Sequence, residues 1–195
     1  MLIVGMGGTV APGSSSERVL RATIAACEAA GATTQLFGGA QLDLPAYRYG
    51  AARCDRAAAL IEALRAADGV VMVSPGYHGT VSGLFKNALD YVEDMAGDPL
   101  PYLDGRAVGV IGVASGWQAA SATLGTLRTI VHALRGWPTP LGLAVNSAQP
   151  LFDDAGQVLD PVLRGQIDLV AAQIVGFAQR LQPHALPART ADARA

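Results

Sequence analysis

Three short stretches of the chain carry residue types that could do chemistry. The most distinctive is residues 74–79, Ser-Pro-Gly-Tyr-His-Gly, which follow an apolar run at 69–73. One aromatic ring, one imidazole and two glycines suit a flat, uncharged ring with polar edges better than a metal ion or a bare phosphate. We predict no metal site, because the 3 histidines stand far apart without metal-ligand spacing: His78, His132 and His184.

The second stretch, residues 7–16, consists almost entirely of small residues. Small residues let backbone N–H groups approach an anion, and the start of the following helix adds its positive end. The hydroxyls of Thr9, Ser14 and Ser16 are candidate donors to a phosphate. An ordinary helix N-cap at Ser14 or Ser16 after a Gly-rich turn explains the same residues, so both interpretations stay open here.

Common nucleotide-binding motifs fail at this stretch. Val10 stands where a GxGxxG fingerprint needs its last glycine, and Phe37-Gly38-Gly39 offers no ribose-binding acid. Gly13 is followed by Ser14 rather than Lys, which excludes a Walker A loop. A small-residue loop without lysine or metal ligands favours a phosphate monoester over a triphosphate.

The elements that must position these stretches alternate between strands and helices. Apolar runs predict strands at residues 2–6, 33–37, 69–73, 106–114 and 140–145, and helical stripes follow each of them, the last from Pro161 to Leu181. This alternation predicts an α/β fold with a five-stranded parallel sheet, flavodoxin-like order 2-1-3-4-5 and helices on both faces. Ligands of such sheets bind at the loops after strands 1, 3 and 4, which here are residues 7–16, 74–83 and 114–119.

Composition limits the class of protein. The 195 residues are 51% hydrophobic and 15% charged with a net charge of −2, which argues against nucleic acid and membrane surfaces as partners. Cys27 and Cys54 form no CxxC pair and indicate a reducing compartment. The N-terminus lacks the cationic region of a signal peptide, so we expect a cytoplasmic protein. We predict a single domain at residues 1–181 and a disordered tail at 182–195.

Two stretches resemble the NADPH-dependent FMN reductase family of flavin, quinone, azo and chromate reductases. Residues 8–16 resemble its GSxRxxS-type phosphate loop, and residues 74–90, SPGYHGTVSGLFKNALD, resemble its P-x-Y-N/H-G…PG-x-L-K-N-A-x-D signature. Carried over position by position, the cofactor-binding residues are Thr9, Ser14, Ser15, Ser16, Pro75, Gly76, Tyr77, His78, Gly79, Ser115 and Gly116. Ala11 departs from the family, which often has Arg there, and Arg18 is a candidate replacement.

The resemblance implies FMN as cofactor, NADPH or NADH as co-substrate, and hydride transfer to flavin N5, then to a free flavin or a quinone-like small molecule. It requires no catalytic side chain, and it implies a homodimer or homotetramer whose partner subunit walls the flavin. Residues 38–53 and helix 82–94 are the interface candidates, although Lys86, Asn87 and Asp90 also fit a solvated helix face. Trp117 is expected to shield the ring, to lie in an interface or to lie in the core. The alternative is a flavodoxin-type FMN electron carrier, which the small net charge disfavours.

Overall fold

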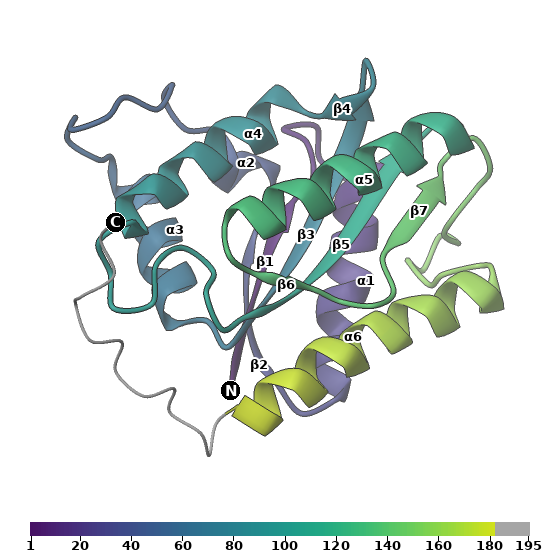
Figure 1. Ribbon diagram of the computed structural model, residues 1–195. Helices are drawn as coiled ribbons and strands as arrows, with labels where there is room; N and C mark the ends of the chain where they lie inside the picture. Colours follow the sequence, from purple (N-terminus) through teal and green to yellow (C-terminus); the bar gives the residue numbers. More distant parts are fainter. Residues whose placement is uncertain (182–195) are drawn as a thin grey trace.

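A central β-sheet runs through the computed structural model, which describes residues 1–181 (Figure 1). The order of its main strands is β2-β1-β3-β5-β6, while β4 pairs with β3 and β7 pairs with β5. The strands are β1 (Leu2–Gly7), β2 (Thr33–Phe37), β3 (Gly69–Tyr77), β4 (Thr80–Val81), β5 (Ala107–Ala114), β6 (Trp137–Pro138) and β7 (Leu143–Asn146). The tail predicted at 182–195 lies outside the described residues.

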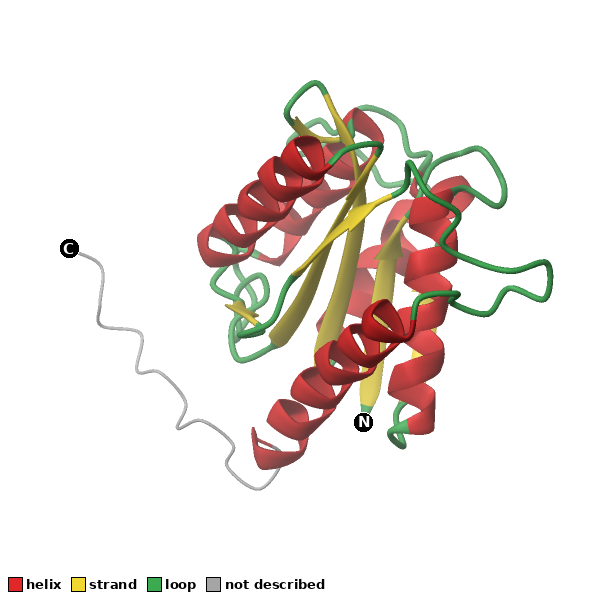
Figure 2. Ribbon diagram, turned by 90° about the vertical axis from the view of Figure 1, so that its right-hand side faces the viewer, coloured by secondary structure: helices red, strands yellow, loops and turns green. Residues whose placement is uncertain are grey.

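Helices cover both faces of this sheet (Figure 2). They are α1 (Ser15–Ala29), α2 (Gly39–Leu42), α3 (Asp55–Ala66), α4 (Gly83–Asp90) with the 3-10 helix η1 (Tyr91–Met95), α5 (Trp117–Ala133) and α6 (Pro161–Leu181). Side chains alternate along β3: Val70 and Met72 pack with α3, α4 and α5, whereas Val71 and Val73 pack with α1 and α6. The strand period of two thus builds two apolar layers from one continuous apolar run.

The sequence predicted five strands, whereas the structure has seven within residues 1–181. The fifth position is shared by β6 and β7, which both pair in parallel with β5. The register shifts by two residues between Val108↔Pro138 and Ile111↔Leu143, across a break that contains Pro140. Because proline has no N–H to donate, the ladder cannot continue through this break. The spatial order of positions agrees with the prediction once β6 and β7 count as one.

Strand β3 is longer than the predicted 69–73, because it continues to Tyr77 and folds back as β4. The pairing of β3 with β4 is antiparallel, so the sheet is not purely parallel. Helix α5 begins at Trp117, well before the apolar stripe that starts at Leu124. None of the helices within residues 1–181 has both the length and the apolar character needed to cross a bilayer.

The parallel register brings the ends of the main strands to one edge of the sheet. Gly7 pairs with Val73, Pro75 with Val113, and Ala114 with Asn146. The segments that follow β1, β3, β5 and β7 therefore emerge side by side. We call residues 7–16, 74–82, 114–119 and 146–150 the edge loops.

Candidate functional site

The second edge loop is a β-hairpin rather than an irregular loop. Tyr77 pairs with Thr80, and His78 and Gly79 between them have φ of 51° and 88°. Two positive φ values are the signature of a type I′ turn, which suits the twist of a hairpin. Tyr77, His78 and Gly79 are exposed at its tip, whereas Pro75 is buried in the sheet.

Two serines fasten the base of this hairpin. The Ser74 hydroxyl is fully buried and accepts a hydrogen bond from the Ser82 N–H at 3.1 Å. The Ser82 hydroxyl in turn accepts from the Phe85 N–H at 3.2 Å and caps α4. A Cβ on Gly76 would lie 2.4 Å from the Thr123 hydroxyl, so α5 packs directly against the hairpin. The hairpin tip is thereby presented on a well-anchored base.

The first edge loop is shaped by hydrogen bonds of its own. The Thr9 hydroxyl both donates to the Ala11 carbonyl and accepts from the Ala11 N–H, each at 3.2 Å. Ser14 is the N-cap of α1, with its hydroxyl accepting from the Glu17 N–H at 3.3 Å, and the Ser14 and Ser16 hydroxyls lie 3.3 Å apart. The N-cap expected at Ser14 or Ser16 is therefore Ser14. Ser15 is half-buried, and Ser16 is buried.

Glycines allow this loop to approach its neighbours closely. A Cβ on Gly39 would lie 1.8 Å from the Thr9 carbonyl oxygen, and one on Gly7 would lie 2.0 Å from the Val73 carbonyl oxygen. No residue with a side chain fits at either distance. Backbone contact, rather than side-chain packing, therefore sets the position of this loop.

The third and fourth edge loops meet at a pair of serines. The Ser115 and Ser147 hydroxyls lie 3.4 Å apart, and the Ser147 N–H donates to the Ala114 carbonyl at 2.9 Å. Gly116 is half-buried and has a φ of 146° immediately before α5. Ser147 was not predicted as a site residue, although its place directly after the last sheet strand was the available signal.

The edge loops carry exposed apolar side chains and no charge. Val10, Tyr77 and Trp117 are 59%, 52% and 64% exposed, one from each of the first three loops. This exposure excludes a core position for Trp117. The four loops contain no Asp, Glu, Lys or Arg. Such a surface is suited to an uncharged planar ring.

Two charged residues flank the first loop at the start of α1. Arg18 points away from it, because its guanidinium donates to the Asp153 carbonyl at 2.8 Å and lies 4.5 Å from the Phe152 ring. In this arrangement Arg18 does not replace the guanidinium missing at Ala11. The Glu17 carboxylate accepts from the Gly13 N–H at 3.0 Å, and the Arg21 guanidinium beside it holds the pKa of that carboxyl below its usual value. Glu17 was not predicted as a site residue, although Ser14-x-x-Glu17 is a capping-box signal in the sequence.

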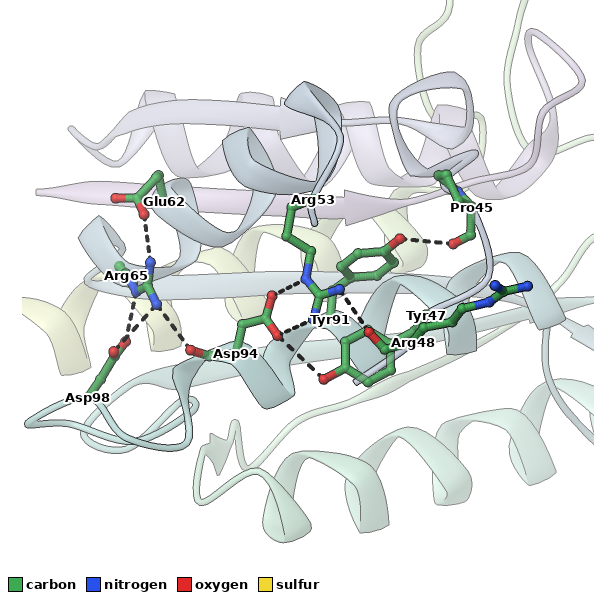
Figure 3. A network of polar contacts seen from close by, with 9 residues as sticks. All are labelled: Pro45, Tyr47, Arg48, Arg53, Glu62, Arg65, Tyr91, Asp94 and Asp98. Atoms are coloured by element: carbon green, nitrogen blue, oxygen red, sulfur yellow. Dashed lines mark hydrogen bonds and ion pairs between the residues drawn. The ribbon is translucent and has the colours of Figure 1, made fainter. Parts of the chain in front are cut away.

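The interface candidate predicted at residues 38–53 overlaps a segment, residues 43–54, that is bound to α4 and η1 of the same chain (Figure 3). The Arg53 guanidinium donates to both carboxylate oxygens of Asp94, at 2.5 and 2.7 Å. The Tyr91 hydroxyl donates to the Pro45 carbonyl at 2.9 Å, and its ring packs edge-on against Tyr47. A pocket of about 280 Å³ lies along this segment and not at the edge loops; it is lined by Pro45, Ala46, Arg48, Ala51, Ala52, Arg53, Cys54 and Tyr91.

Within the resembling stretch 74–90, Asn87 contacts this segment of the chain. Its side chain accepts from the Tyr47 N–H at 2.9 Å and donates to the Leu44 and Pro45 carbonyls. Lys86 and Asp90, one helical turn apart, form an ion pair with each other on the exposed face of α4. Asn87 therefore has a structural role in positioning residues 44–47.

Known proteins share both the sequence and the fold. An FMN-dependent NADPH-azoreductase of Staphylococcus haemolyticus is 36% identical over 118 residues, which cover 60% of this chain and 59% of that protein. The structure of an apo NADH:FMN oxidoreductase matches with a TM-score of 0.71 and 20% identity, over 95% of this chain and 91% of that one. A flavodoxin of Streptococcus pneumoniae TIGR4 matches with a TM-score of 0.61 and 10% identity, over 90% and 99%.

These likenesses establish the fold as α/β and flavodoxin-like, with the parallel sheet and its covering helices as its common part. The chain spans about three-fifths of the length of the azoreductase that it matches. A family model described as NADPH-dependent FMN reductase matches residues 1–150, more than half of the chain. The chain therefore belongs to the NADPH-dependent FMN reductase family.

Proposed function

We propose that this protein is an NAD(P)H-dependent FMN reductase. The observation that carries the proposal is the meeting of three uncharged loops at one sheet edge, the first of which leads into the hydroxyl-rich start of α1 while the other two carry the exposed rings of Tyr77 and Trp117. An anionic tail and a flat neutral ring are the two parts of FMN that such a surface would separate. Family membership supports the same assignment.

The proposed phosphate site is the start of α1. The hydroxyls of Ser14 and Ser15 and the backbone N–H groups of residues 14–16 are the proposed donors, and the positive end of the helix adds to them. Ser16 supports this site through its contact with the Ser14 hydroxyl. Thr9 contributes to the shape of the loop, because its hydroxyl is engaged with Ala11.

The proposed ring site is bordered by Pro75, Gly76, Tyr77, His78 and Gly79 on one side and by Ser115 and Gly116 on the other. FMN, when bound, supplies the chemistry that passes a hydride from the nicotinamide to the acceptor. The protein's residues hold and orient the ring and keep carboxylates and strongly basic groups away from it, since the edge loops contain no Asp, Glu, Lys or Arg. We assign no catalytic side chain.

Further proposals concern the acceptor and the assembly. The uncharged edge with exposed Tyr77 and Trp117 supports a flavin or quinone-like molecule as the acceptor. The same exposed rings support a homodimer or homotetramer in which a second subunit covers them. The two free cysteines, Cys27 and Cys54, support a reducing compartment such as the cytoplasm.

The test measures FMN binding and then follows the absorbance of NADPH or NADH with and without a quinone. Oxidation of the nucleotide that depends on FMN and increases with the quinone supports the reductase. FMN binding without nucleotide turnover would indicate an electron carrier, the alternative function that the likeness to a flavodoxin suggests. Failure to bind FMN at micromolar protein would remove both functions.

The phosphate site has its own test in the double variant Ser14→Ala, Ser16→Ala. We expect FMN binding to weaken by about 1–3 kcal/mol, because the phosphate loses the Ser14 hydroxyl as a donor and the site loses the Ser16 hydroxyl that supports it. Riboflavin, which has the ring without the phosphate, serves as the control ligand and should bind as before. Equal FMN affinity in the variant and the unmodified protein would place the phosphate elsewhere.

A further inference from the structure

The exposed turn of the first edge loop is tied to α1 through one carboxylate. Residues 10–13 are all exposed, and Gly13 has a φ of 71°. Within residues 1–181, the hydrogen bond that joins this turn to the helix runs from the Gly13 N–H to Glu17 Oε2, at 3.0 Å. The other oxygen, Oε1, accepts from the Arg21 guanidinium at 2.7 and 3.1 Å, so both ends of the carboxylate are fixed.

This arrangement is a capping box displaced by one residue. In the usual capping box, the acid three residues after the N-cap accepts from the N–H of the N-cap itself. Here Glu17 accepts from Gly13, the residue before the N-cap Ser14. The N–H of Ser14 is consequently left without an acceptor, and across the described residues the first-turn N–H groups of Ser15 and Ser16 have none either. Three adjacent donors remain open at the positive end of a fifteen-residue helix.

Charge compensation makes the carboxylate compatible with an anion nearby. The Glu17 side chain is only 14% exposed, and the Arg21 guanidinium lies directly against it. A dianionic ligand at Ser14–Ser16 would therefore meet a neutralised pair rather than a free negative charge. Glu17 can then hold the turn without repelling the ligand.

We propose that Glu17 is a positioning residue for the phosphate of FMN. By holding the Gly13 N–H, it fixes residues 10–13 and leaves the Ser14 N–H open to the phosphate, beside the first-turn N–H groups of Ser15 and Ser16. This inference rests on the proposed function. It adds a residue outside the loop that resembles the family's phosphate motif, and it concerns the phosphate alone, not the ring.

The test compares Glu17→Ala, Glu17→Gln and the control Glu28→Gln, which changes an acid at the far end of α1. Dissociation constants for FMN and for riboflavin are measured by quenching of flavin fluorescence, with thermal unfolding recorded for each variant. We expect Glu17→Ala to weaken FMN binding about tenfold, the size of one hydrogen bond to a charged group, and to leave riboflavin binding unchanged. Glu17→Gln keeps an oxygen that accepts from Gly13 and should stay within about threefold of the unmodified protein.

Other results would overturn the inference. Equal weakening of FMN and riboflavin in Glu17→Ala would show a merely structural cap, and tighter FMN binding would show that the carboxylate competes with the phosphate. A Glu17→Gln variant as weak as Glu17→Ala would show that charge matters and the hydrogen bond does not. In these cases the proposed function stands if the unmodified protein still binds FMN. Absence of FMN binding by the unmodified protein would overturn the proposed function and this inference together.

Discussion

The edge loops and the 43–54 segment are held in place by opposite means. The edge loops contain no Asp, Glu, Lys or Arg; they are positioned by close backbone approach at Gly7 and Gly39 and by hydrogen bonds to the Ser74 and Ser82 hydroxyls, and a carboxylate that also holds them, Glu17, lies outside them. The 43–54 segment is fastened by side chains, chiefly the Arg53–Asp94 ion pair and the Tyr91 and Asn87 hydrogen bonds (Figure 3). Both regions expose aromatic rings, Tyr49 in the 43–54 segment among them, but only the edge loops bring such rings to the sheet edge at which the start of α1 leaves its N–H groups open.

This difference separates a binding surface from a structural one. An ion pair in the edge loops would place charge beside the proposed flavin ring, whereas backbone contacts shape the loops without adding charge. The 43–54 segment has no such restriction, and its arginine lies over the Tyr47 ring at 4.8 Å and the Tyr91 ring at 5.3 Å. Substitutions in the two regions should therefore have different effects on stability and on ligand binding.

The largest effect is expected from Gly39→Ala. Its new methyl group would lie 1.8 Å from the Thr9 carbonyl oxygen, so the loop must shift, at a cost of about 3 kcal/mol in the free energy of unfolding. FMN binding should fall with it. The neighbouring variant Gly38→Ala is the control, because its methyl group would meet only side-chain ends, Gln41 Oε1 at 3.3 Å and Glu17 Oε1 at 4.0 Å. Urea unfolding of both variants checks the prediction, and equal stabilities would contradict it.

Asp94→Ala should destabilise the 43–54 segment by about 1.5–3 kcal/mol, because it leaves the half-buried Arg53 guanidinium without its carboxylate. FMN affinity should change little, since this residue lies away from the edge loops. The matched control is Asp98→Ala, whose partner Arg65 is more exposed, with an expected cost of at most about 1 kcal/mol. Urea unfolding measures stability. A large loss of FMN affinity in Asp94→Ala would show that the two regions are not separate.

Acid should weaken the same ion pair. The Arg53 guanidinium lowers the pKa of the Asp94 carboxyl below its ordinary value of 3.8. A lowered pKa means that the stabilisation is complete above the ordinary value and is lost as the pH falls below it. The stability difference between the unmodified protein and Asp94→Asn should therefore shrink when unfolding is measured at pH 3 rather than pH 7. A difference independent of pH would show that the charge of Asp94 contributes nothing.

Trp117→Ala should have the smallest effect on stability, less than about 0.5 kcal/mol, because the ring is 64% exposed. It should raise the KM for an aromatic quinone by the equivalent of about 0.5–1.5 kcal/mol, the strength of an aromatic contact. Trp137→Ala is the control. This ring is similarly exposed, at 59%, but it lies on β6 and pairs with Ala107 at the start of β5, the end opposite to the edge loops. Similar KM values for the two variants would remove Trp117 from the acceptor site.

Much of the fold could be predicted because it depends on local patterns. Apolar runs separated by helical stripes indicated the parallel sheet, and the carboxyl ends of parallel strands meet at one edge whatever the loops contain. The break between β6 and β7 was missed, because the apolar run after Pro140 shows no sign that Trp137 and Pro138 already pair with β5. The hairpin at His78-Gly79 was missed as well, since His-Gly is not one of the dipeptides, such as Asn-Gly or Asp-Gly, that signal a type I′ turn.

The sequence by itself determined the alternation of elements, the family and the three loops that share an edge. Each follows from the order and spacing of residues close together in the chain. Only the tertiary structure decided which side chains serve those loops: Arg18 turns to Phe152, Asn87 binds the backbone at Tyr47, and Glu17 takes the Gly13 N–H. A polar side chain with several donors or acceptors within reach binds the ones that packing brings nearest, and for Arg18 and Asn87 those lie far along the chain.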